Sequence, residues 1–273
     1  MPRLLCSFVA VALLVLTTRA SATAPEAECA DAPPDRRIFI CSVLIDSMRL
    51  AGTALSRAYD NRGVALALKG QYDRALGDFN EAIRLAPDNA VAWYNRGNVF
   101  LETRVLDRAI ADFTRALVLH PTDGRTYGAR GVAHLRNGQV ANALLDFDVA
   151  VRLLPQDATI LNNRGTAHFR NGHLDLAISD YTEAIRLRPN YGFAYYNRGN
   201  AFAHVGRIRE AIADLTQAIL LGPPSAGAYY NRGAAHLLLG ERDKTISDMR
   251  SALTLDPHHA KAKAVLRMLG LEP

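Results

Sequence analysis

The sequence lacks the motifs that would mark an enzyme or a metalloprotein. It contains no glycine-rich phosphate loop and no Ser-His-Asp arrangement apart from its repeated pattern. Only three of its 273 residues are cysteines, and no carboxylate or thiolate recurs in phase with its histidines to complete a metal site. These absences favour a protein that is not an enzyme and that uses no cofactor or metal.

Long apolar runs are missing after residue 22. Before that point, Arg3 supplies a short positive region, and residues 4–16 form an apolar stretch that is too short to span a bilayer. Residues 20–22 read Ala-Ser-Ala, which is a small-x-small cleavage pattern. We therefore expect residues 1–22 to be a secretory signal cleaved after Ala22, with an uncleaved membrane anchor as the alternative. The mature protein is then expected to be soluble, without stable membrane insertion, and to be periplasmic or secreted.

A strong excess of one charge is also absent. The formal net charge of +5 falls to +3 once Arg3 and Arg19 leave with the signal, which contains no acidic residue. No stripe of interleaved lysines and aromatic residues is present. A mild positive charge without such a stripe does not predict nucleic-acid binding.

A repeat with a period of 34 residues occupies most of the chain. The tripeptide Asn-Arg-Gly recurs at residues 61–63, 95–97, 163–165, 197–199 and 231–233, and the remaining slot, 129–131, reads Ala-Arg-Gly. With Ser56 as position 1, the six units are 56–89, 90–123, 124–157, 158–191, 192–225 and 226–259. A period of this length is typical of helical repeat arrays.

Each unit repeats the same packing positions. Position 8 is glycine, position 27 is alanine and position 32 is proline in all six units, while positions 4 and 24 mostly carry large apolar or aromatic residues. Apolar residues at helical spacing predict two helices per unit, and the proline ends the second helix. Over residues 56–259 this pattern resembles the tetratricopeptide repeat family. The resemblance implies an all-α, right-handed solenoid of antiparallel helix pairs whose neighbouring units bury each other's apolar faces.

Every unit has arginine at position 7 and aspartate at position 23. We expect each arginine to pair with the aspartate of its own unit between the two helices, because a guanidinium can hold a carboxylate through two parallel hydrogen bonds. The alternative is that both residues are independent, solvated helix positions. The expected pairs are Arg62–Asp78, Arg96–Asp112, Arg130–Asp146, Arg164–Asp180, Arg198–Asp214 and Arg232–Asp248.

The period also continues backwards past the first unit. Cys29 and Cys41 lie one period before Gly63 and Ala75, so they occupy positions 8 and 20 of a degenerate unit, where the two helices touch. In an exported chain we expect a Cys29–Cys41 disulfide that staples a truncated N-terminal capping unit, residues 23–55. Two buried free thiols are the alternative.

At the other end, residues 260–273 are expected to form a capping helix. Val265, Leu266 and Leu269 make one apolar stripe, and repeat arrays need a cap to cover their last exposed face. A helix that lies on a membrane surface is the alternative.

The tetratricopeptide resemblance implies that the first helix of each unit lines a concave groove. On this basis the groove carries asparagines at position 6, further amides at position 9, tyrosines at position 5 and several arginines. The candidate peptide-binding residues are Asn61, Asn95, Asn98, Asn163, Asn197, Asn200, Asn231, Tyr94, Tyr196, Tyr230, Arg57, Arg125, Arg136 and Arg170.

A carboxamide both donates and accepts hydrogen bonds, so this asparagine ladder could hold an extended peptide by its backbone. The ladder resembles the repeat region of O-linked GlcNAc transferases, although fourteen residues after the last unit are too few for their transferase domain. Position 5 lacks the basic residues that a carboxylate clamp requires. The alternative is that asparagine at position 6 is common local chemistry, such as capping or bonding the neighbouring helix. Three histidines share the inward position 11 and are interpreted as core residues rather than metal ligands: His134, His168 and His236.

The sequence therefore predicts a non-enzymatic interaction scaffold or adaptor of a bacterial cell envelope, which binds extended segments of a protein or peptide partner. One alternative is a binder of an anionic polymer or glycan that uses the four groove arginines. Another is a structural component that self-assembles through its convex face. The sequence specifies neither the identity of the partner nor the oligomeric state.

Overall fold

The computed structural model describes residues 25–272, which fold into fifteen α-helices without a strand among them. The predicted signal, residues 1–22, lies outside the described residues. The helices are α1 (Pro25–Asp31), α2 (Pro34–Asp46), α3 (Gly52–Leu68), α4 (Tyr72–Leu85), α5 (Ala90–Glu102), α6 (Leu106–Leu119), α7 (Gly124–Arg136), α8 (Val140–Leu153), α9 (Ala158–Arg170), α10 (Leu174–Leu187), α11 (Gly192–His204), α12 (Ile208–Leu221), α13 (Ala226–Leu238), α14 (Arg242–Leu255) and α15 (Ala260–Met268).

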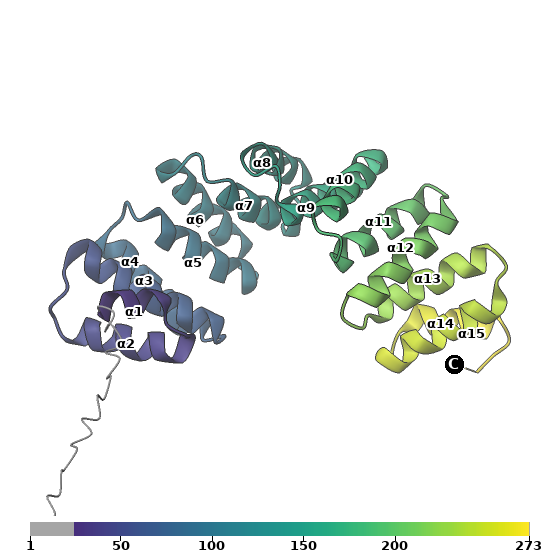
Figure 1. Cartoon of the computed structure of the whole chain (residues 1–273), viewed down its shortest axis with the longest axis horizontal. Coiled ribbons are helices and arrows are strands. Elements are labelled where there is room, and N and C mark those ends of the chain that lie inside the picture. Colours follow the sequence, from purple (N-terminus) through teal and green to yellow (C-terminus); the bar gives the residue numbers. More distant parts are fainter. Residues whose placement is uncertain (1–24, 273) are drawn as a thin grey trace, which may run out of the picture.

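Each 34-residue unit is an antiparallel helix pair, from α3–α4 to α13–α14, so the predicted all-α solenoid is confirmed (Figure 1). From α5 onwards every first helix has 13 residues and begins where its unit begins. The exception is α3, which has 17 residues and begins at Gly52, one turn before Ser56. That extra turn joins the repeats to the N-terminal pair α1–α2.

The turn inside each unit is made by a residue in the left-handed conformation. Glycine fills this place in five units, with φ between 72° and 80°, because glycine adopts positive φ without a steric cost. In the second unit the place belongs to Arg104, at φ 61°. Each second helix ends two residues before the proline of position 32, which cannot continue a helix.

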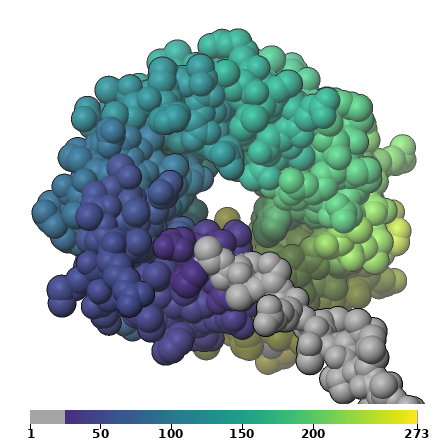
Figure 2. All heavy atoms as spheres, turned by 60° about the vertical axis from the view of Figure 1, so that its left-hand side comes forward, coloured from purple at the N-terminus to yellow at the C-terminus, as the bar shows by residue number. Residues whose placement is uncertain are grey.

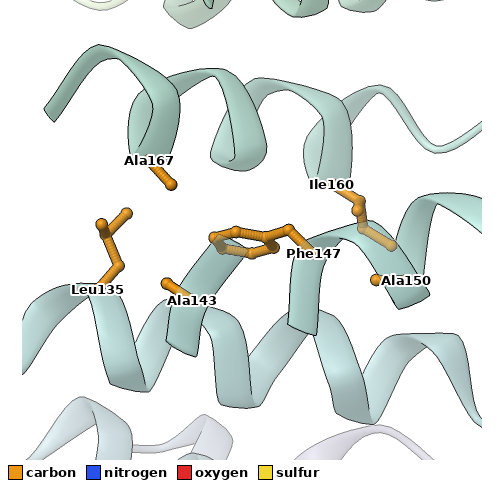
Figure 3. Packing of buried hydrophobic residues seen from close by; sticks show 6 residues of the cluster. All are labelled: Leu135, Ala143, Phe147, Ala150, Ile160 and Ala167. Atoms are coloured by element: carbon orange, nitrogen blue, oxygen red, sulfur yellow. The ribbon is translucent and has the colours of Figure 1, made fainter. Parts of the chain in front are cut away.

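The glycine of position 8 lets the two helices of a unit touch. A Cβ atom built on Gly97 would lie 2.7 Å from the Phe113 ring, and one on Gly131 would lie 2.8 Å from the Phe147 ring. Both rings are fully buried. Phe147 also packs beneath α9, against the cluster that contains Ile160 and Ala167, and so connects one unit to the next (Figure 3). The core is therefore a row of such clusters rather than a single centre.

The stacked pairs curve into an arch that encloses a hollow (Figures 1 and 2). Consecutive first helices contact one another, from α3 with α5 to α11 with α13. The first helices therefore lie on the inside of the curve, and their exposed residues form the concave face that borders the hollow.

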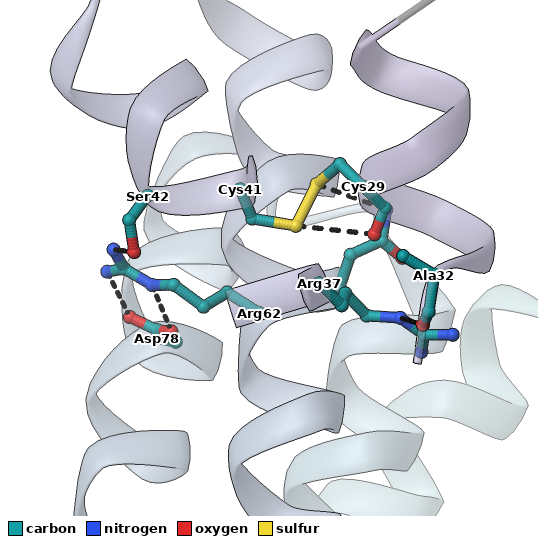
Figure 4. Close-up of a disulfide and its surroundings, with 8 residues drawn as sticks. Cys29, Ala32, Arg37, Cys41, Ser42, Arg62 and Asp78 are labelled. Carbon is teal, nitrogen blue, oxygen red and sulfur yellow. Dashed lines mark hydrogen bonds and ion pairs between the residues drawn. A yellow bond between two sulfur atoms is a disulfide. The ribbon is translucent and has the colours of Figure 1, made fainter. Parts of the chain in front are cut away.

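The two ends of the array are covered differently. At the N-terminus, Cys29 of α1 and Cys41 of α2 form a disulfide with an S–S distance of 2.08 Å, buried against Ala58 of α3 (Figure 4). At the C-terminus, the single helix α15 places Ala262 and Leu266 in a buried cluster with Met249 of α14.

The predicted arginine–aspartate pairs are confirmed in all six units. In each, the arginine Nε and Nη2 donate to the two carboxylate oxygens over 2.7–2.9 Å. The third nitrogen, Nη1, donates over 2.6–3.2 Å to a side chain on the second helix of the preceding unit, a contact that the sequence analysis did not predict. In the first unit, Arg62 joins Asp78 to Ser42 (Figure 4). Each guanidinium thus holds three helices from two units together.

We predict that Arg198→Met lowers the free energy of unfolding by about 3–5 kcal/mol, because it leaves the buried Asp214 carboxylate without its cation. Replacing both residues, as Arg198→Met with Asp214→Leu, should recover most of this loss. Urea unfolding followed by circular dichroism measures both effects. The control is Arg186→Met, which breaks an exposed pair with Glu183 and should cause no measurable loss. Equal losses in the two single variants would contradict a structural role for the buried pair.

Candidate functional site

The concave face is lined by α3, α5, α7, α9, α11 and α13. In Figure 2 the hollow is open to solvent and bordered by residues from both halves of the chain. The predicted asparagines and tyrosines lie along these helices at a partly buried depth, whereas the four arginines are exposed.

Several asparagines of position 6 bond the first helix of the preceding unit. Asn95 donates to both carboxylate oxygens of Asp60, at 3.0 and 3.2 Å, and Asn197 donates to Oδ1 of Asn162 at 2.9 Å. Asn231 donates to the Tyr196 hydroxyl at 3.2 Å and to Oδ1 of Asn200 at 2.8 Å. Asn61 of the first unit lies 4.0 Å from Sγ of Cys29.

These contacts correspond to the structural alternative that the sequence left open. They occupy amide donors that would otherwise point into the groove. Within residues 25–272, Asn98 and Asn163 have no such partner. Their carboxamides are partly exposed on α5 and α9, on either side of α7.

The four candidate arginines fall into two groups. Arg136 and Arg170 each donate one Nη1 hydrogen bond to a carbonyl near the end of the preceding first helix, Leu101 at 3.2 Å and Leu135 at 3.0 Å. Cations at helix C-termini also interact favourably with the helix dipole. Arg125 lies 3.6 Å from Asp123 with a side chain that is 79% exposed, and Arg57 is exposed on α3.

The three tyrosines are set into the wall of the groove rather than standing free in it. Tyr94 packs its ring against Phe113 with centroids 5.8 Å apart, and Tyr230 lies 4.9 Å from the His259 ring. The Tyr196 hydroxyl accepts the bond from Asn231. In each case the ring is held by neighbours, which reduces the entropy that would be lost on binding a ligand.

A pocket of about 590 Å³ opens between the beginnings of α5 and α7. Three of the candidate residues line it, Tyr94, Asn95 and Arg125, together with Val91 and Asp123. This volume is within the range of small-molecule sites and is large enough for one or two side chains of a partner.

The position-11 histidines lie beside the aspartates of the arginine pairs. Their Nε2 atoms are 3.7 Å from Asp146 for His134, 3.9 Å from Asp180 for His168 and 4.0 Å from Asp248 for His236. Burial lowers the pKa of His168. The described residues contain no group of three or more ligands that could hold a metal ion, and none of their helices has the length and hydrophobicity of a membrane span.

Asp60 is a groove residue that the sequence analysis did not single out. It is 7% exposed, and its neighbour Asn95 supplies hydrogen bonds but no charge. Burial raises the pKa of Asp60 to about 6, and the hydrogen bonds from Asn95 only partly oppose this rise. Comparing position 5 of one unit with position 6 of the next could have revealed it. Asp60 and Asn162, both at position 5, each accept a hydrogen bond from the position-6 asparagine of the following unit.

We predict that Asp60→Asn makes the folded protein more stable at pH 7. The pKa of Asp60 is higher in the folded protein than in the unfolded chain. The protonated carboxyl therefore contributes stability below pH 4, and this contribution is lost as the pH rises through about 6. About two pKa units correspond to about 3 kcal/mol. The variant keeps an acceptor for Asn95, as Asn162 does for Asn197, and should gain part of this energy.

Urea unfolding at several values between pH 4 and pH 7 measures the difference between Asp60→Asn and wild type. That difference should grow with pH. The exposed Asp88→Asn serves as the control and should change the free energy of unfolding little. A flat difference for Asp60→Asn would show that this carboxyl titrates normally.

Solved structures that resemble the chain are helical repeat proteins. A chain of the APC/C hetero-tetramer Cut9–Hcn1 has a TM-score of 0.75 at 19% identity, with 89% of this chain and 47% of that chain covered, so this chain spans about half of its length. YrrB, described as a TPR protein with an unusual peptide-binding site, has a TM-score of 0.57 at 23% identity, with 69% and 97% covered. PilF of Pseudomonas aeruginosa has a TM-score of 0.70 at 16% identity, with 78% and 97% covered. Identities this low show the fold alone.

Two family models match the sequence. The model of the ETO1 C-terminal domain matches residues 84–268, and a TPR repeat model matches residues 61–103. No curated protein matches the sequence significantly. With its period, its helix pairs and these matches, the chain belongs to the tetratricopeptide repeat family.

Proposed function

We propose that the protein is a non-enzymatic scaffold that binds extended segments of a partner protein in its concave groove. Tetratricopeptide repeat proteins bind protein or peptide partners, and YrrB is described as having a peptide-binding site. The observation that carries the proposal is the pair of carboxamides, Asn98 and Asn163, on the concave face, which have no hydrogen-bond partner among residues 25–272. Each can donate to and accept from a peptide backbone.

The groove is also rigid enough to bind with little ordering cost. Its tyrosine rings are held by packing and its walls are helices joined by arginine–aspartate pairs. An extended segment carries unpaired N–H and C=O groups along both edges, so it needs polar partners that are already in place. The amides provide such partners without selecting a side chain.

An anionic polymer is less well suited to this face than a peptide. Two of the four groove arginines, Arg136 and Arg170, use one donor to hold the end of a neighbouring helix. Polymer binding through the arginines should weaken steeply with salt, whereas binding through amides should not.

Export to an oxidising compartment is part of the proposal. The disulfide Cys29–Cys41 supports it, because such bonds persist in the periplasm and outside the cell. If residues 1–22 are a cleaved signal, N-terminal sequencing of the protein purified from the envelope or medium of its host should begin at Thr23. Recovery of the chain with Met1 intact would contradict cleavage.

The function is tested with a phage-displayed library of random dodecapeptides, selected on the mature chain. We expect enriched peptides whose binding weakens with salt but is retained between 0.05 and 0.5 M NaCl, because salt screens contacts with the arginines and leaves backbone bonds to the amides in place. In hydrogen exchange they should protect first helices such as α5, α7 and α9 and leave second helices such as α6 and α8 unchanged. Protection limited to the second helices, or loss of binding in salt together with tight binding of dextran sulfate, would overturn the groove proposal. Growth of particle mass in light scattering without any ligand would instead favour self-assembly.

A further inference from the structure

The first helix α7 differs from the other first helices on the concave face. At positions 5 and 6, which carry polar side chains in the other five units, α7 has Gly128 and Ala129, and at position 9, which is polar in three of the six units, it has Val132. Ala129 and Val132 are half-buried: both pack partly against the core clusters of neighbouring helices, and the rest of their surface is exposed on α7, between α5 and α9. This surface, which we call the α7 strip, has no side chain that can hydrogen bond.

The chain itself shows what is missing at the α7 strip. At the α11–α13 junction, Asn231 bonds both Tyr196 and Asn200. The same positions at the α5–α7 junction are Tyr94, Asn98 and Ala129, so the hydroxyl and the carboxamide of α5 have no partner among the described residues.

The opposite edge of the strip is open as well. Asn197 donates to Asn162 of the preceding unit, whereas for Asn163 of α9 the equivalent position in the preceding unit is Gly128, which offers no side-chain acceptor. The hydrogen-bonded ladder is therefore interrupted on both sides of α7. These unsatisfied groups mark a place where a ligand can bond without displacing an internal contact.

Positive charge stands at both ends of the strip. Arg125 begins α7 and Arg136 ends it, and both are exposed. Asp123 lies 3.6 Å from Arg125, whose side chain is 79% exposed and keeps most of its donors free. Eleven helical residues span about 16 Å, which is the length of about five residues in an extended strand. Arg170 on α9 adds a third cation near the Arg136 end.

We propose that α7 is the specific binding site of the groove, and that it takes an extended segment with apolar residues at its centre and acidic residues about five positions apart. Backbone groups of the segment bond Tyr94 and Asn98 on one edge and Asn163 on the other. Apolar side chains cover Ala129 and Val132, and the acidic residues reach the arginines at each end of the strip. This inference rests on the proposed function and adds the location and the partner's chemistry.

The test uses a fluorescein-labelled peptide, acetyl-Gly-Asp-Val-Ala-Val-Ala-Asp-Gly-amide, and the same peptide with lysine in place of both aspartates. Fluorescence anisotropy with the mature chain should show binding of the acidic peptide and at least tenfold weaker binding of the lysine peptide. Ala129→Asn should weaken binding at least tenfold, because the new carboxamide bonds Tyr94 and Asn98 as Asn231 bonds their counterparts. Asn163→Ala should also weaken binding, by about fivefold.

Asn142→Ala is the matched control, since it removes an exposed asparagine of the second helix α8, outside the concave face. It should change binding less than twofold. If Ala129→Asn fails to fold by circular dichroism, Arg125→Glu replaces it and should weaken binding of the acidic peptide and strengthen that of the lysine peptide. Equal binding of the two peptides, or unchanged binding to Ala129→Asn, overturns the α7 site.

The two proposals fail in different ways. Library peptides that protect only α11 and α13 would leave the groove function standing and would overturn the α7 site. Library peptides that protect no first helix would overturn the groove function, and the α7 site with it.

Discussion

The partly buried guanidinium of position 7, with its buried aspartate, forms the interaction on which the rest of the structure depends. A fork of two hydrogen bonds fixes its aspartate on the second helix, and its remaining nitrogen reaches the preceding unit. In five units it also stacks on the aromatic ring of position 4, with centroid distances of 4.8–5.7 Å. Burying such a pair stabilises little compared with apolar packing, but leaving it unmatched is costly. The forks therefore act mainly on geometry. They tie the two helices of a unit to each other and to the second helix of the preceding unit.

The three residues of Asn-Arg-Gly act at three different boundaries. The glycine lies between the two helices of a unit, where a methyl group would collide with the position-24 side chain. The arginine joins two units on the side of the second helices. The asparagine joins two units on the side of the first helices, where it faces the groove. Only the asparagine contacts can be missing without loss of the buried core. They are missing at residues 129–131, which read Ala-Arg-Gly. An array built of near-identical units can thus have one distinct position while every packing contact is kept.

Features that depend only on where one residue falls within the 34-residue period could be predicted from the sequence. The helix pairs follow from the 34-residue period, the turns from glycine and proline, and the pairing of Cys29 with Cys41 from counting one period back. Features that need two residues from different units could not be predicted so easily. The bond from Asn95 to Asp60 spans 35 residues, and the contact from Arg96 to Asn80 depends on the rotation between neighbouring pairs. The raised pKa of Asp60 depends on burial, which the family pattern of the groove does not indicate. The candidate asparagines lie on the predicted helices. Whether their amides are free to bind a ligand depends on the acceptors that the preceding unit offers, which the phase of one residue does not show.

Because its two caps differ in how they are held, the array is expected to unfold from one end first. The first pair, α1–α2, is closed by a covalent bond, whereas α15 is held by packing and by a hydrogen bond from Arg242 to the Leu269 carbonyl. In a chain whose units contact only their neighbours, local opening begins at the end with the weaker cover. Fraying, and the proteolytic trimming that follows it, should proceed from the C-terminus towards α13 and then α11. The hydrogen-bonded asparagines of α11 and α13 would then be lost before the groove around α7 is degraded. Where proteases reach the protein, cleavage of the last two units would then precede damage to the middle of the molecule.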